Sequence, residues 1–126
     1  MIRVFAFLAL LAVMLAGCSA GRSLSLDDDG TRVLLRPGDE IKVTLEGNAT
    51  TGFSWELVES DPAVLNALSE PVYEEANTGL IGGGGKWTWR LAAQEPGECE
   101  VRFVYHRTWG DEPPEATFSF TAKVNQ

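Results

Sequence analysis

The sequence predicts an all-β protein, with an immunoglobulin-like antiparallel β-sandwich of about seven strands as its fold. Apolar residues alternate with polar ones through most of the chain, which is the pattern of half-buried strands rather than helices. Turn residues such as Pro-Gly pairs separate the alternating stretches, and only one short segment has a helical pattern. Many short strands at this spacing are typical of a sandwich.

Each expected strand carries its apolar residues at every second position. In residues 116–124, for example, the alternate residues from Ala116 to Val124 are all apolar and share one face. The other expected strands are residues 32–36, 41–45, 53–57, 68–75, 87–91 and 98–106. The segment with helical character is residues 61–68, where Asp61 is a candidate N-cap and Pro62 occupies the first helical position.

The turns that separate these strands determine what the fold can present to a partner. Turn residues occur at 36–39 and 94–97, and a run of four glycines at 82–85 is expected to link two strands of a hairpin. A sandwich gathers its loops at two ends, so loops that are far apart in sequence can form one continuous surface.

The N-terminus is typical of an export signal. Residues 4–15 are apolar and follow a single arginine, Arg3, and a run of this length suits a secretory signal better than a membrane-spanning helix. Leu15-Ala16-Gly17-Cys18 resembles the lipobox of bacterial lipoproteins, in which the cysteine is acylated and becomes the first mature residue. The alternative is an ordinary signal peptide in which Cys18 is incidental.

We therefore expect three regions: a lipoprotein signal peptide at 1–17, a flexible acidic tether at 18–30 that includes three consecutive aspartates, and one folded domain at 31–126. Acylation of Cys18 would anchor the protein to the membrane of a bacterial cell envelope. By resemblance to enterobacterial lipoproteins, Ser19 after the cysteine is compatible with the outer membrane, facing the periplasm.

Composition limits the classes of partner. The 126 residues, 44% of them hydrophobic, suffice for one globular domain, which we expect to be a monomer. The formal net charge of -8 disfavours nucleic acid as a partner, because binding to the phosphate backbone needs a basic surface.

Catalytic and metal chemistry find little support in the sequence. His106 is the only histidine, and it falls at a strand end or surface position. Cys99 shares a strand face with Val101 and Phe103, so we interpret it as a small buried residue rather than a nucleophile or metal ligand. The acidic residues at 74–75, 111–112 and 115 are interpreted as solvated surface. We expect no enzyme activity, no cofactor and no metal site.

Three loops have unusual composition. The first is Asn48-Ala49-Thr50-Thr51-Gly52-Phe53, the second is the glycine run at 82–85, and the third is Arg107-Thr108-Trp109-Gly110. Trp109 lies beyond the end of the strand at 98–106, so it is either folded back onto the core or offered to a partner. Tryptophan and arginine are enriched among binding hot spots.

Taken in order, these motifs resemble those of the chagasin-type family of cysteine protease inhibitors, and the resemblance covers residues 31–124. It implies a reversible inhibitor that occludes the active-site cleft of papain-like proteases with three loops. The residues that match the family motifs, and that the resemblance therefore assigns to protease binding, are Asn48, Thr50, Thr51, Gly52, Phe53, Gly82, Gly84, Gly85, Arg107 and Trp109. In the family the first loop approaches the catalytic cysteine and the other two flank the cleft.

The chain departs from the family pattern at three positions. Ala49 and Thr108 stand where proline is usual, and Gly110 stands where an acidic residue often follows the tryptophan. These departures concern the rigidity of the loops and hence the affinity. The alternative function is a lipid-anchored sandwich that binds another protein or a glycan, or takes part in envelope assembly, without inhibitory activity.

Overall fold

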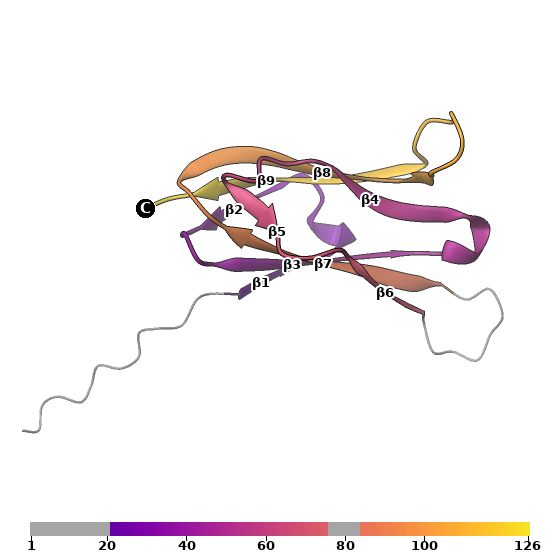
Figure 1. Ribbon diagram of the computed structural model, residues 1–126, viewed down its shortest axis with the longest axis horizontal. Coiled ribbons are helices and arrows are strands. Elements are labelled where there is room, and N and C mark those ends of the chain that lie inside the picture. The colour runs from indigo at the N-terminus through magenta and orange to yellow at the C-terminus, as the bar shows by residue number, and fades with distance from the viewer. Residues whose placement is uncertain (1–20, 76–83) are drawn as a thin grey trace, which may run out of the picture.

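The computed structural model describes residues 21–75 and 84–126, and in these residues two β-sheets face each other (Figure 1). The first sheet contains β1 (Gly21–Leu24), β3 (Glu40–Gly47), β7 (Gly85–Ala93) and β5 (Leu65–Ala67) in that order, with β6 (Val72–Glu75) also paired to β7. The second sheet has the order β2 (Thr31–Leu35), β9 (Ala116–Val124), β8 (Gly97–Arg107) and β4 (Phe53–Glu59). The all-β sandwich is confirmed.

The strand count and the pairing differ from the expectation. The described residues form nine strands instead of about seven, and the sheets are mixed instead of purely antiparallel. The two parallel pairs are β1 with β3 and β2 with β9. Both arise from the N-terminal segment, which adds β1 to an edge of the first sheet and then β2 to an edge of the second.

Alternating residues of both sheets fill the space between them. Ile41, Val43 and Leu45 of β3 are fully buried, as are Phe103 of β8 and Phe118 of β9. Aromatic pairs cross the core, with the Trp89 and Phe103 ring centroids 4.8 Å apart. The strict period of two along each strand is what sends these side chains inward and leaves their neighbours at the surface.

Residues 21–30, which were expected to belong to a flexible tether, are part of the fold. Leu24 of β1 is only 7% exposed and lies in the core. A 3-10 turn, η2 (Leu26–Asp28), follows. Asp28 accepts a hydrogen bond from the Ser25 N–H at 2.8 Å, and Asp29 accepts one from the Ser119 N–H at 2.9 Å. The aspartate run is tolerated because two of its carboxylates are satisfied by backbone donors.

Residues 61–75 also differ from the expectation. Asp61 does cap a turn, because its side chain accepts from the Ala63 N–H at 3.1 Å and its carbonyl accepts from the Leu65 N–H at 2.8 Å. One turn is all that forms before Leu65 enters β5 beside Ala93. The strand expected at 68–75 is shortened to β6, since the chain leaves the sheet before Pro71, which has no N–H to donate.

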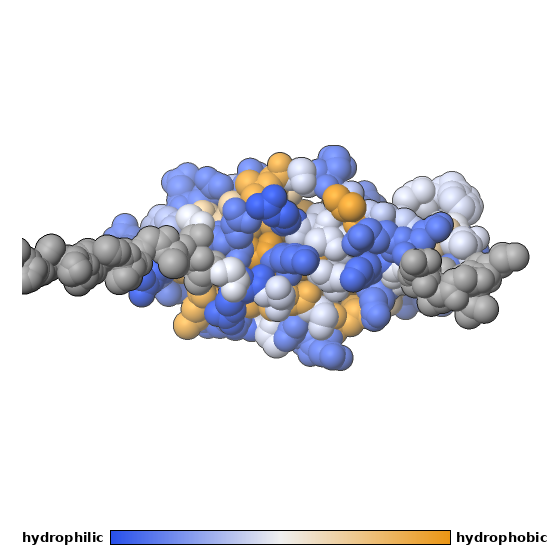
Figure 2. Space-filling model, turned by 90° about the horizontal axis from the view of Figure 1, so that it is seen from below, coloured by the Kyte–Doolittle hydropathy of each residue, from blue (hydrophilic) through white to orange (hydrophobic). Residues whose placement is uncertain are grey.

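The surface carries no concentrated apolar face in the view of Figure 2, where hydrophilic and apolar residues are interspersed. No helix within the described residues is long and apolar enough to cross a membrane. The apolar N-terminal segment and Cys18 lie outside those residues.

Candidate functional site

Four strands bring the first loop, the described glycines of the second loop and the third loop to one end of the sandwich, the end drawn at the right of Figure 1. β3 ends at Gly47, which pairs with Gly85 at the start of β7. β4 begins at Phe53, which pairs with Arg107 at the end of β8. This end, formed by residues 47–53, 84–85 and 107–110, is called the loop end below. Gly82 lies outside the described residues.

The first loop is held in shape by its own polar groups. Asn48 Oδ1 accepts hydrogen bonds from the Thr50 N–H at 3.0 Å and from the Thr50 hydroxyl at 2.6 Å. The Thr51 hydroxyl donates to the Asn48 carbonyl at 2.8 Å. These bonds curl Ala49–Thr51 into a 3-10 turn, η3, so that Thr50 and Thr51 stand exposed at its tip. These hydrogen bonds hold the shape of the turn without the proline that the family pattern has at position 49.

Tyr105 fixes the base of that loop from the opposite sheet. Its hydroxyl accepts from the Asn48 N–H at 2.8 Å and donates to the Asn48 carbonyl at 3.3 Å. Its ring packs between Phe53 and Trp55, with centroid distances of 5.2 and 5.1 Å. A half-buried tyrosine whose hydroxyl bonds both polar groups of one residue holds that residue's position and orientation.

Gly52 ends the 3-10 turn in a conformation that suits only glycine. Its φ is +87°, in the left-handed region, and its N–H donates to the Ala49 carbonyl at 3.0 Å. A Cβ at this position would overlap the far edge of the Trp109 ring. Gly52 thus lets the first loop turn sharply and lets the third loop lie directly against it.

The third loop presents its tryptophan to solvent. Trp109 is 72% exposed, which decides between the two alternatives for this residue: it is not folded into the core. It follows Arg107, whose Nε donates to the Thr51 carbonyl at 3.4 Å and whose guanidinium lies 4.6 Å from the centroid of the Phe53 ring. Arg107 therefore joins the third loop to the first.

Close backbone approach explains the two described glycines of the second motif. A Cβ on Gly85 would lie 2.5 Å from both the Glu74 carbonyl oxygen and the Tyr73 hydroxyl, and one on Gly84 would lie 3.0 Å from the Gly47 carbonyl oxygen. A side chain at Gly85 would push β6 away from β7, and one at Gly84 would push the end of β3 away from the start of β7.

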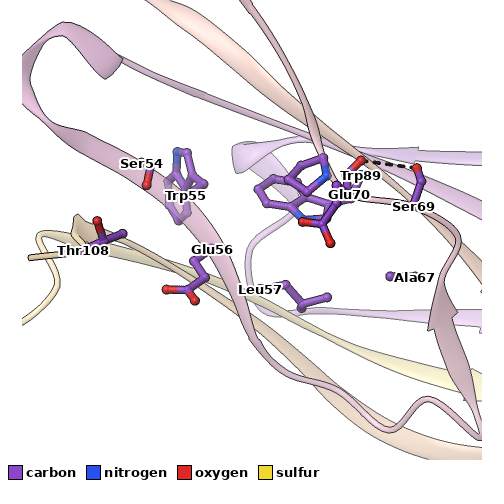
Figure 3. A pocket seen from close by; sticks show the side chains of 10 residues that line it. Ser54, Trp55, Glu56, Leu57, Ala67, Ser69, Glu70, Trp89 and Thr108 are labelled. Atoms are coloured by element: carbon purple, nitrogen blue, oxygen red, sulfur yellow. Dashed lines mark hydrogen bonds between the residues drawn. The ribbon is translucent and has the colours of Figure 1, made fainter.

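A cavity of about 380 Å³ opens beside the loop end, between β4 and the chain that links β5 to β6 (Figure 3). Trp55 and Trp89 line it from the core, and Ser69 and Glu70 line it from the link. Thr108 lines it as well, so this side chain lies on the flank of the sandwich, and both Thr108 and Trp109 are exposed.

The reactive side chains of the described residues do not converge on a catalytic arrangement. His106 Nε2 lies 2.8 Å from Glu56 Oε1 on the neighbouring strand, which is a cross-strand contact at the surface. Burial raises the pKa of the Cys99 thiol, an effect that a backbone hydrogen bond with Asp61 partly offsets and the Asp61 charge adds to. A raised pKa keeps this thiol protonated and unreactive. No group of three potential metal ligands occurs within residues 21–75 and 84–126.

The sequence-predicted residues at the loop end lie together, with Gly82 outside the described part of the chain. Sequence reasoning missed Gly47 and Tyr105 as parts of this arrangement. Tyr105 continues the inward alternation of Cys99, Val101 and Phe103, but alternation gives no sign that its hydroxyl reaches a loop 57 positions away. Gly47 precedes the first motif and carries no signal of its own, although a Cβ there would lie 2.7 Å from the Tyr105 ring.

Comparisons with known proteins identify the family of this chain. The sequence profile of the chagasin family of peptidase inhibitors, I42, matches residues 35–124. Amoebiasin-1 of Entamoeba histolytica is 34% identical over 103 residues, covering 82% of this chain and 97% of that protein.

Two solved structures share the fold. The cysteine protease inhibitor EhICP2 from Entamoeba histolytica has a TM-score of 0.74 at 19% identity and covers 83% of this chain and 96% of its own. PbICP-C, solved in complex with falcipain-2, has a TM-score of 0.57 at 20% identity and covers 86% of this chain and 95% of its own. The chain belongs to the chagasin family, whose members are inhibitors of cysteine proteases and not enzymes.

Proposed function

We propose that this protein inhibits papain-like cysteine proteases by inserting its loop end into the active-site cleft. The observation that carries the proposal is the position of Trp109, which is exposed and lies against the first loop at Gly52. An exposed tryptophan that already packs against a neighbouring loop offers a large contact area and loses less side-chain freedom on binding than an unsupported one. The complex of PbICP-C with falcipain-2 supports a protease of this class as the partner.

The shape of the first loop accounts for inhibition without cleavage. A protease needs its nucleophile within about 3–3.5 Å of a scissile carbonyl, in an aligned geometry. The Asn48 carbonyl already accepts from the Thr51 hydroxyl, and the Ala49 carbonyl accepts from the Gly52 N–H at 3.0 Å. A loop curled by its own hydrogen bonds can fill the cleft while withholding an extended peptide bond from attack.

An inhibition assay tests this proposal. Residues 19–126 should inhibit papain reversibly, and Trp109→Ala should raise the inhibition constant by roughly 30-fold or more, which corresponds to about 2 kcal/mol at a hot spot. The matched control is Leu34→Ala, because Leu34 is also a large exposed apolar side chain, at 58% exposure, but lies on β2. Equal inhibition constants for the two variants would contradict the role of Trp109.

We further infer that the protein is a lipoprotein of a bacterial envelope, acylated at Cys18 and held on the outer membrane facing the periplasm. The lipobox-like Leu15–Cys18 sequence and the apolar run before it support this inference. Several acyl chains, at about 0.8 kcal/mol per buried methylene, suffice for stable attachment. Cys18→Ser should move the protein from the membrane fraction to the soluble fraction or block its processing. A wild-type protein that is wholly soluble after export would contradict the inference.

A further inference from the structure

The link between the proposed lipid anchor and the folded domain is very short. Only Ser19 and Ala20 separate Cys18 from Gly21, the first residue of β1. Three Cα steps span at most about 11 Å even when fully extended. The first strand therefore starts close to the modified residue, whatever conformation the link adopts.

The direction of β1 determines which end of the sandwich is close to the anchor. β1 runs parallel to β3, with Gly21 beside Glu40 and Leu24 beside Val43. β3 then continues to Gly47, which belongs to the loop end. At about 3.3 Å per residue, Glu40 and Gly47 are about 23 Å apart. Gly21 is thus at the opposite end of the sandwich from the candidate protease-binding loops (Figure 1).

This first strand is fixed in the domain. All four of its residues pair with β3, and Leu24 is buried in the core. Farther along, the Gly30 N–H donates to the Ser119 carbonyl at 2.7 Å. Releasing β1 to lengthen the link would expose Leu24 and break the edge pairing.

Two turns complete the end that carries Gly21, called the anchor end below. The Gly38 N–H donates to the Ala93 carbonyl at 2.9 Å, and the Ala93 N–H donates to the Asp39 carbonyl at 2.8 Å, so the turn at 36–39 adjoins the end of β7. The turn at 94–96 follows directly and leads into β8.

Charge differs between the two ends. At the loop end and the strand ends beside it, acids outnumber bases: Glu46, Glu74, Glu75, Asp111, Glu112 and Glu115 accompany Lys86 and Arg107. In the half with the anchor end the two signs are balanced: Arg22, Arg32, Arg36, Lys42, Arg90 and Lys123 accompany Asp39, Glu40, Asp61, Glu95, Glu98 and Glu100. An anionic bilayer therefore repels the loop end more strongly than the anchor end.

We propose that the anchor end faces the anionic phospholipid surface and that the loop end points away from it, so that the anchored inhibitor captures proteases from the aqueous phase. The orientation rests on the proposed acylation of Cys18, and its consequence for capture rests on the proposed protease-binding role of the loops. The length of the link, the direction of β1 and the charge difference all favour the same orientation.

The orientation is measurable with one fluorophore at each end. The full-length acylated protein is purified from membranes in a Cys99→Ala background and inserted from outside into vesicles of phosphatidylethanolamine and phosphatidylglycerol. A fluorophore is attached to Glu95→Cys at the anchor end or to Asp111→Cys at the loop end, both of which are exposed positions. The vesicles contain lipid with a nitroxide on its headgroup, which quenches only nearby fluorophores.

We expect several-fold stronger quenching at position 95 than at position 111. Equal quenching, or stronger quenching at 111, would overturn the proposed orientation. An unmodified Cys18, detected by mass spectrometry of the purified protein, would overturn the lipid anchor and the orientation with it.

A separate measurement concerns capture. Papain added outside the vesicles should be inhibited by the anchored wild-type protein with the same inhibition constant as by the soluble protein of residues 19–126. Weaker inhibition by the anchored form alone would contradict outward presentation of the loops. If the soluble protein of residues 19–126 also fails to inhibit papain, the papain-directed inhibitory function fails, while the quenching result still decides the orientation.

Discussion

At the scale of single residues, Tyr105 links the two sheets at the loop end. Its hydroxyl bonds both backbone polar groups of Asn48, and its ring packs on Phe53 and Trp55. It stands two residues before Arg107 on β8, so the strand that presents the third loop also fixes the first. Tyr105 is a positioning residue, since it acts on the candidate site through Asn48.

Tyr105→Phe keeps the aromatic packing and removes both hydrogen bonds. We expect the free energy of unfolding to fall by about 1 kcal/mol and inhibition of papain to weaken, mainly through faster dissociation, because the first loop is less ordered before binding. Tyr73→Phe is the matched control. The ring centroids of Tyr73 and Trp87 lie 4.5 Å apart, and the Tyr73 hydroxyl forms no hydrogen bond with the described residues of the three loops. Identical dissociation rates for the two variants would exclude a positioning role for the Tyr105 hydroxyl.

Residue 52 meets two structural requirements, a positive φ and space for the Trp109 ring, and an experiment can separate them. Gly52→Ala places a Cβ at a φ of +87° and also against Trp109, whereas Gly38→Ala at a φ of +97° meets no atom within 4 Å. Both variants should lose roughly 1 kcal/mol or more of stability, because alanine is strained at positive φ. Only Gly52→Ala should weaken papain inhibition strongly. Thermal melting and inhibition constants of the pair check this, and comparable inhibition by both variants would show that contact between Gly52 and Trp109 is unimportant.

At the scale of elements, the third loop is a tight turn. The Gly110 N–H donates to the Arg107 carbonyl at 3.5 Å, which places Thr108 and Trp109 at the two central positions of a four-residue turn. No described residue other than glycine has a positive φ, which excludes the turn types that need one at a central position. Thr108 therefore occupies the second position of a turn, where proline is favoured.

Thr108→Pro should stabilise the protein by about 0.4–1 kcal/mol, since proline removes freedom from the unfolded chain at a position that suits it. Inhibition should also become tighter, mainly through slower dissociation, because the loop is ordered before binding. Melting curves and inhibition constants beside wild type measure both effects. Thr108→Ala controls for loss of the hydroxyl, and a loss of stability specific to proline would show that the backbone here does not suit it.

Local sequence patterns predicted most of the strands that position the loop end. Alternation identified the strands β3, β4, β7, β8 and β9, and turn composition identified the loops between them. Both signals are local, because each depends only on residues a few positions apart in the sequence. The additional edge strands β1 and β5 were missed. β1 is mostly polar apart from Leu24, and β5 is only three residues long, so each is a strand only because a longer partner strand is available.

The same distinction applies to the candidate site. Motif composition predicted the residues that make up the loop end. Some of them adopt backbone conformations that only certain residue types allow, such as the positive φ of Gly52, and those residue types can be read from the sequence. Contacts between distant segments were not visible. The bond from Tyr105 to Asn48 and the contact of Arg107 with Thr51 depend on the pairing of β4 with β8, which no local signal specifies.

At the scale of the whole molecule, the sandwich has two ends with different roles in our proposals. The loop end carries Trp109 and the curled first loop, and the anchor end carries the start of β1. The four residues of β1, which begin three positions after the proposed acylation site, are thus part of the domain's architecture, and they determine how the domain is held. Where the folded unit begins is therefore a question about both stability and orientation.

Two truncated proteins answer it, one beginning at Gly21 and one at Thr31. The shorter protein loses β1, and burial of a leucine side chain such as Leu24 contributes about 1.5–3 kcal/mol. Since 1 kcal/mol shifts the melting temperature of a domain of this size by about 4–8 °C, the shorter protein should melt roughly 5–20 °C lower. Its inhibition of papain at a temperature where it remains folded should match that of the longer protein, because β1 starts at the end opposite the loops. Leu24→Ala in the longer protein should produce part of the same decrease while keeping the strand. Equal melting temperatures for the two truncated proteins would show that residues 21–30 behave as a tether after all, and the fixed orientation at the membrane would then lose its basis.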